Sequence, residues 1–144
     1  MIDLEHAKQA LNAGCTCTAC HGDVIYRSVD RGVKPLLRFL DDGIDLMGFS
    51  AADKAVGSAA AMLYCLLGVR RVYGKIMSVS AVKILRSQGI ETSWGVLAEN
   101  ILNRSKTGLC PMETALMGIE DPEEGLVVIR STLAQLEMRS KARE

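Results

Sequence analysis

The feature that most constrains this chain is a stretch of fifteen residues, 55–69, that contains no charged side chain. It is bounded by Lys54 on one side and by Arg70 and Arg71 on the other. An apolar helix needs about 20 residues to cross a bilayer, so this stretch is too short to span one. Within it, residues 57–61 are all Gly, Ala or Ser, and small side chains let a helix pack closely against its neighbours. The sequence therefore predicts a helix buried inside a globular protein and no membrane-spanning segment.

The composition is that of one globular domain over residues 1–144, because 49% of the residues are hydrophobic and 24% are charged. Seventeen basic and seventeen acidic residues give zero net charge, and aromatic residues make up only 4%. A nucleic-acid-binding protein usually shows a basic surplus or a base-stacking platform, so we expect no nucleic-acid partner. The first fourteen residues lack the apolar core of a signal peptide. We therefore expect a cytoplasmic protein whose five cysteines are reduced thiols.

Hydrophobic spacing and turn residues predict an α/β fold. Ser50 and Asp53 have the spacing of a capping box, which places the start of the long small-residue helix at Ser50. A strand, an eleven-residue helix and a second strand follow, and such a crossover joins parallel strands. The predicted fold is a mixed sheet with helices on both faces. The expected elements are helices over 3–11 and 34–43, a hairpin over 15–28 turning at His21, Gly22 and Asp23, a helix over 50–67, a strand over 69–77, a helix over 78–88, a strand over 90–96, and helices beginning near 110 and 121.

Four possible metal ligands gather in the predicted hairpin. Cys17, Cys20 and His21 have the spacing of a c-type haem attachment site, but that attachment takes place in an exported compartment. Cys15 completes a zinc site with them only if the segment is a loop. In a strand, Cys15 and Cys17 point to one face and Cys20 points to the other. We interpret the group as strand cysteines and a turn histidine, and we expect no bound metal and no cofactor.

Asp53 and Lys54 stand at the beginning of the predicted small-residue helix. Asp53 is explained there as a capping residue. Lys54 opposes the helix dipole at that position, so the capping interpretation leaves it unexplained. If both side chains face a cleft, Asp53 can act as an acid/base group and Lys54 can contact an anion. Ser50, at the predicted helix start, is a further candidate for binding the same ligand.

The segment 103–113 places cations and hydroxyl groups directly before a helix start, which is a natural site for an anion. The helix dipole makes a thiol at this position more reactive, so Cys110 is a candidate nucleophile and Glu113 a candidate proton carrier. The alternative is that Cys110 and Glu113 only cap the helix. No Ser-His-Asp set can be assembled, because the chain has two histidines, His6 and His21, and neither is near this segment in sequence. The candidate ligand-binding residues of the segment are Asn103, Arg104, Lys106 and Thr107.

Three parts of the chain carry a resemblance to a known group of proteins: residues 49–61, which include Asp53-Lys54, the pair Asn103-Arg104, and residues 107–113 with their Cys-Pro-Met-Glu ending. Together they resemble an uncharacterised prokaryotic family of domains of unknown function, placed in the cytidine deaminase-like superfamily. The resemblance covers most of the chain, from the hairpin to the helix after Pro122. It implies a three-layer α/β/α fold with the order helix, hairpin, helix, strand, helix, strand.

The zinc chemistry of that superfamily is not expected to accompany the fold. A zinc deaminase carries a His or Cys two residues before its catalytic Glu, at the start of the first core helix. If Asp53 takes the place of that Glu, the ligand position is Ala51, which cannot bind zinc. The second motif, Pro-Cys-x-x-Cys, is expected at the helix after the next strand, where residues 78–82 contain no cysteine. We therefore expect no deaminase-type zinc and no hydrolytic deamination.

These observations favour a deaminase-like fold whose former active-site cleft binds a small anionic ligand, such as a nucleotide or a phosphorylated metabolite. An alternative is an enzyme without zinc that uses Cys110 as nucleophile and Asp53 or Glu113 as acid/base. A second alternative is a structural or regulatory homo-oligomer with a vestigial cleft, in which the small-residue helix packs within or between subunits. Because deaminase-like folds often assemble, the resemblance also leads us to expect a homo-oligomer. The sequence leaves open whether any reaction is catalysed.

Overall fold

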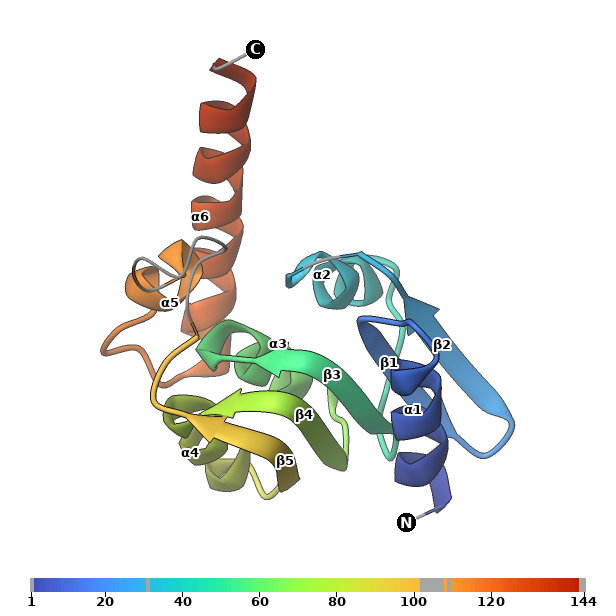
Figure 1. Cartoon of the computed structure of the whole chain (residues 1–144). Coiled ribbons are helices and arrows are strands. Elements are labelled where there is room, and N and C mark those ends of the chain that lie inside the picture. Colours follow the sequence, from blue (N-terminus) through green and yellow to red (C-terminus); the bar gives the residue numbers. More distant parts are fainter. Residues whose placement is uncertain (1, 31, 102–107, 109, 143–144) are drawn as a thin grey trace.

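A computed structural model describes residues 2–30, 32–101, 108 and 110–142. Figure 1 shows a twisted sheet flanked by helices, with the last helix projecting away from the rest of the molecule. The elements are α1 (Ile2–Asn12), β1 (Cys17–His21), β2 (Val24–Ser28), α2 (Lys34–Asp41), β3 (Ser50–Val56), α3 (Ser58–Leu67), β4 (Arg71–Ser78), α4 (Val79–Ser87), β5 (Glu91–Ala98), α5 (Pro111–Ala115) and α6 (Pro122–Ala142).

The five strands form one mixed sheet in the order β2-β1-β3-β4-β5. β1 runs antiparallel to both β2 and β3, whereas β3, β4 and β5 are parallel. α1 packs against β1 and β3 on one face, and α3 and α4 pack side by side on the other. These layers confirm the predicted three-layer α/β/α fold, with the hairpin first and the parallel crossover later. β5 also extends to Ala98, into a stretch for which the sequence pattern predicted no element.

The predicted helix start at Ser50 is wrong, because residues Ser50–Val56 form β3, the central strand of the sheet. α3 begins only at Ser58, after Gly57. The capping-box pattern is a local signal, and hydrogen bonding of β3 to β1 on one side and β4 on the other overrides it. Asp53 therefore lies within a strand and caps no helix. The residue-by-residue match of Asp53 to a catalytic Glu at a helix start fails for the same reason.

The small residues of β3 are explained by its central position. Ala51 faces the main core under α3, while Ala52 faces α1 and contacts the cluster that contains Ala7 and Leu11. Both alanine side chains are fully buried. A strand covered by helices on both faces leaves room only for short side chains at its closest contacts.

The small-residue helix packs within the chain. The α3 residues from Ser58 to Tyr64 are all buried in the core, and α3 contacts α2, α4 and α6. The outer layer includes α6, where Gly125 comes so close to Met62 of α3 that an added Cβ would collide with its sulfur. No helix of the described residues is long and apolar enough to cross a membrane.

Candidate functional site

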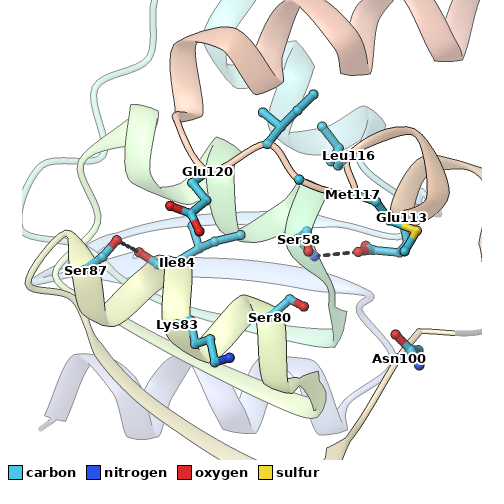
Figure 2. A pocket seen from close by; sticks show the side chains of 12 residues that line it. Ser58, Ser80, Lys83, Ile84, Ser87, Asn100, Glu113, Leu116, Met117 and Glu120 are labelled. Atoms are coloured by element: carbon cyan, nitrogen blue, oxygen red, sulfur yellow. Dashed lines mark hydrogen bonds between the residues drawn. The ribbon is translucent and has the colours of Figure 1, made fainter.

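A cavity of about 510 Å³ lies beyond the carboxyl ends of the parallel strands (Figure 2). In open α/β sheets this edge is the usual place for a ligand, because the loops and helix starts that follow the strands meet there. Its walls come from the first turn of α3, from α4, from the residue pair after β5, and from α5 with the turn that follows it. The lining residues are Ser58, Ser80, Lys83, Ile84, Ser87, Asn100, Glu113, Leu116, Met117, Gly118, Ile119 and Glu120.

Polar groups reach this cavity from several elements. Ser80 and Lys83 lie on α4, which begins at this edge because Ser78 acts as its N-cap: the Ser78 Oγ accepts a hydrogen bond of 3.1 Å from the amide of Ala81. Asn100 is the second residue after β5 and lies on the other side of the opening (Figure 2). The cavity thus combines one cation, two carboxylates (Glu113 and Glu120), hydroxyl groups and an amide, a mixture that suits a ligand with several hydrogen-bonding groups.

The carboxylate of Glu113 is bound to the start of α3. Its Oε2 accepts a hydrogen bond of 2.9 Å from the amide of Ser58. Gly57, the N-cap residue of α3, provides no side-chain cap, and a Cβ there would collide with the Glu113 carboxylate. A carboxylate at a helix N-terminus satisfies an unpaired N–H and interacts favourably with the helix dipole. Glu113 therefore ties α5 to the core, a contact between segments that are 55 residues apart.

Removing this tie should lower stability. We expect Glu113→Ala to reduce the free energy of unfolding by about 1–2 kcal/mol, because the Ser58 amide loses a charged acceptor. Glu113→Gln should recover most of the loss, since the amide oxygen can still accept the bond. Urea unfolding followed by circular dichroism measures both effects. Equal stability of Glu113→Ala and the wild type would contradict the capping role.

Asp53 lies in a different environment, a buried cluster of three polar side chains. Its Oδ2 accepts a hydrogen bond of 2.7 Å from the hydroxyl of Tyr64 on α3, and that hydroxyl lies 3.3 Å from the Sγ of Cys17. Cys17 is the direct neighbour of Asp53 across the β1–β3 ladder. Burial raises the pKa of Asp53 to about 6, against the lowering effect of the hydrogen bonds from Tyr64 and the amides of Ala55 and Lys54. Burial likewise raises the pKa of the Cys17 thiol and of Tyr64.

The structure separates the residues that the sequence pattern placed in one cleft. Asp53 and Lys54 line a smaller pocket of about 340 Å³, together with Thr16, Cys17, Asp30, Gly32 and Ala55. Glu113 lines the larger cavity instead, and Cys110 is among the lining residues of neither. Ser50 is fully buried at the amino end of β3, about 20 Å of strand away from the carboxyl edge. Asn103, Arg104, Lys106 and Thr107 lie outside the described residues.

The larger cavity brings in residues that sequence reasoning missed, among them Ser58, Ser80, Lys83 and Asn100. Each lies within about five residues of the carboxyl end of a strand or at a helix start, so correct strand assignments would have pointed to them. Because residues 50–67 were predicted as one helix, Ser58 was assigned to the middle of a helix and its position at a helix start was missed.

Two of the three cysteines near the N-terminus, Cys17 and Cys20, lie in a strand as predicted, whereas Cys15 precedes β1, so its interpretation as a strand residue is wrong. Cys17 lies in the core under α3, whereas Cys20 lies in the cluster against α1, on the opposite face of β1. His21 is at the end of β1, where its Nδ1 lies 3.3 Å from Asp3 Oδ2. Among the described residues, no group of three or more His, Cys, Asp or Glu side chains is placed to hold a metal ion.

Comparison with known proteins gives one family. The family model described as "Domain of unknown function (DUF1893)" matches residues 6–133. The crystal structure of TM1506, a DUF1893 family protein from Thermotoga maritima, is similar with a TM-score of 0.80 and 27% sequence identity, covering 91% of this chain and 87% of that chain. The comparison with curated proteins found no match. The predicted resemblance to an uncharacterised domain family is therefore confirmed.

Proposed function

Since the chain belongs to the DUF1893 family of domains of unknown function, we propose a role from its own geometry: it binds a small anionic ligand in the cavity at the carboxyl edge of the sheet. The observation that carries the proposal is the convergence of Lys83, Ser80 and Asn100 on one opening beside the first turns of two helices. The ligand class is a nucleotide or another phosphorylated metabolite.

One cation, Lys83, and two carboxylates, Glu113 and Glu120, line the cavity, so the place that suits an anion is beside Lys83 on α4. Lys83 is exposed to solvent and lies at the middle of α4, about one turn after Ser80, which is at the positive end of that helix dipole. The negative charge of Glu113 is directed at the Ser58 amide of α3, so it already has a favourable partner. A phosphate bound beside Lys83 and Ser80 would therefore face the α4 N-terminus, while Glu113 holds the corresponding position on α3.

The apolar wall supports a ligand that is more than a bare anion. Ile84, Leu116 and Ile119 line the same cavity, and pockets for organic ligands typically place a few polar groups in a largely apolar lining. A nucleoside monophosphate combines an apolar base face, hydroxyl groups and a phosphate. Its volume fits comfortably within about 510 Å³.

We also propose that this cavity is the former active-site cleft of a cytidine deaminase-like fold. The proposal rests on the order of elements and on the position of the cavity at the starts of α3 and α4, where such a fold would hold its catalytic zinc. Those first turns contain Ser58, Ala59 and Ala60 in α3 and Val79 and Ser80 in α4, none of which is a usual zinc ligand. The cleft is therefore a binding site without deaminase-type metal chemistry.

Binding is tested first by native mass spectrometry of freshly purified protein, before and after denaturation. We expect an adduct that is lost on unfolding and whose mass gives the ligand class. Isothermal titration with inorganic phosphate and the four ribonucleoside 5′-monophosphates provides affinities. Lys83→Ala should weaken the observed binding at least about tenfold, as expected for loss of a charged hydrogen bond.

Lys75→Ala is the matched control, because Lys75 is an exposed lysine of β4 that does not line the cavity. It should leave binding unchanged. Retention of full affinity in Lys83→Ala, or failure of all five compounds to bind together with the absence of a copurified adduct, would refute the proposal.

A further inference from the structure

The outer face of α6 carries an exposed stripe that none of the described elements covers. Val127 and Met138 are 69% and 71% exposed, and Ser131 and Ala134 between them are exposed as well. Successive members of the stripe are four, three and four residues apart, so they follow one side of the helix over three turns. Ile129, which is fully buried, lies on the opposite side of α6 and packs on the core.

The far half of α6 lacks the support that the first half receives. Gly125 and Ile129 are buried against the body, but from residue 134 onward nearly every described position is exposed. Figure 1 shows this half as the part of the helix that projects from the molecule. An isolated helix of about a dozen residues is only marginally stable in water, so a partner on this segment would stabilise it.

We propose that α6 pairs antiparallel with α6 of a second copy of this chain through the stripe formed by Val127, Ser131, Ala134 and Met138. In that arrangement Val127 faces Met138 of the other copy, and Ser131 faces its Ala134. The pattern is therefore complementary to itself when one helix is reversed, as a two-fold symmetric interface requires.

Charge complementarity indicates that a second copy of the chain covers the stripe and that the two α6 helices run antiparallel. Glu123 lies in the first turn of α6 and Lys141 in the last, and the helical repeat of 100° per residue places both along the same flank of the stripe. Antiparallel pairing puts Glu123 of each copy beside Lys141 of the other. Parallel pairing would place the two Glu123 side chains together and the two Lys141 side chains together. Opposed helix dipoles also favour the antiparallel arrangement.

The contact is small, and this sets the expected affinity. One pair of helices buries less area than the roughly 1,200 Å² of a standard stable interface, so we expect a dissociation constant in the micromolar range. The dimer leaves the cavity at the carboxyl edge of the sheet open, because no member of the stripe lines that cavity; Ala134 borders the groove between α6 and α2 instead. The dimerisation proposal can therefore be tested independently of ligand binding.

The test is sedimentation velocity of the full chain over a concentration series. Wild-type protein should show a reversible monomer–dimer equilibrium. Glu123→Lys and Lys141→Glu should each weaken the dimer at least about tenfold, because each creates two like-charge contacts. The double variant, which carries both exchanges, should restore dimerisation. In that variant Glu124 and Arg139 still place a charge that the helix dipole favours at each end of α6. Circular dichroism confirms that each variant retains its helix content.

Glu5→Lys serves as the control, a charge reversal on the exposed side of α1, far from the stripe in sequence. It should leave association unchanged. Met138→Glu should abolish the dimer by placing a charge in the apolar stripe. A wild type that stays monomeric at roughly 100 µM, a dimer that survives Glu123→Lys, or a double variant that fails to recover would each overturn the proposal.

Discussion

Asp53→Asn should make the protein more stable at neutral pH, by about 2 kcal/mol in the free energy of unfolding. The pKa of Asp53 is raised from 3.8 to about 6 by burial, so at pH 7 the folded state holds an ionised carboxylate in the core. A shift of about 2.2 pKa units corresponds to about 3 kcal/mol. About 1 kcal/mol of this is expected to be lost again, because asparagine has one acceptor oxygen: if that oxygen accepts from Tyr64, the Ala55 amide faces an NH2 group and loses its hydrogen bond.

The sign of the pH dependence follows from proton binding. Between pH 4 and pH 6 the folded protein binds more protons at Asp53 than the unfolded chain, so the stability contributed by this group falls as the pH rises. The advantage of Asp53→Asn should therefore be small at pH 4 and fully developed at pH 7.5. Urea unfolding of both proteins at several pH values measures the difference directly. An advantage that is constant with pH, or reversed at pH 7.5, would contradict this account.

Asp23→Asn provides a matched control, since Asp23 is an exposed aspartate in the hairpin turn. Its effect should remain within about 0.5 kcal/mol at every pH. A buried carboxylate that costs stability is typical of a functional position, because burial and a nearby hydroxyl prepare such a group for proton transfer. An acid/base role of Asp53 is therefore still a hypothesis. Cys110, the candidate nucleophile, does not line the same pocket.

Ala52→Leu should destabilise the protein by about 3 kcal/mol. Ala52 is fully buried in the central strand and packs against Ala7 and Leu11 of α1. Three additional carbon atoms at this position force α1 away from the sheet, and overpacking of a dense core costs about 1–3 kcal/mol even where neighbours adjust. The midpoint of urea unfolding, with the slope compared to that of the wild type, gives the loss.

Ala55→Leu is the control for this prediction, because Ala55 belongs to the same strand and is exposed. The same added volume should change stability by no more than about 0.5 kcal/mol there. If both substitutions cost equally, the contact of Ala52 with α1 would not be the cause of the loss.

Some elements of the fold could be predicted because their signals are local. Gly22 marks the hairpin turn with a positive φ of 58°, and Pro35 and Pro111 sit in the first turns of α2 and α5. Strand, helix and strand from β4 to β5 were expected from periodicity, and their parallel pairing from the length of the crossover. The opposite faces of Cys17 and Cys20 follow from strand alternation alone.

The candidate site could not be assembled in the same way. Ser58 and Glu113 are 55 residues apart, and only the packing of α5 against α3 brings the carboxylate to the helix start. Asp53 and Lys54 were noticed for their charge, but their pocket depends on the β1–β3 pairing and on the loop that contributes Asp30 and Gly32. A sequence pattern reports on neighbours along the chain, whereas a site is made by neighbours in space.

The sequence by itself determined the fold class, the hairpin, the parallel crossover and the membership of an uncharacterised family, because each depends on short-range spacing or on motifs read directly from the residues. Only the tertiary structure decided that Ser50–Val56 is a strand, since small residues with a capping pattern suit a helix equally well until β1 and β4 hydrogen-bond to both edges. It also decided that Glu113 caps α3 and that Asp53 is buried beside Tyr64. Those contacts join segments that are distant in the sequence. They are determined by the free energy of long-range packing, which a local sequence pattern does not contain.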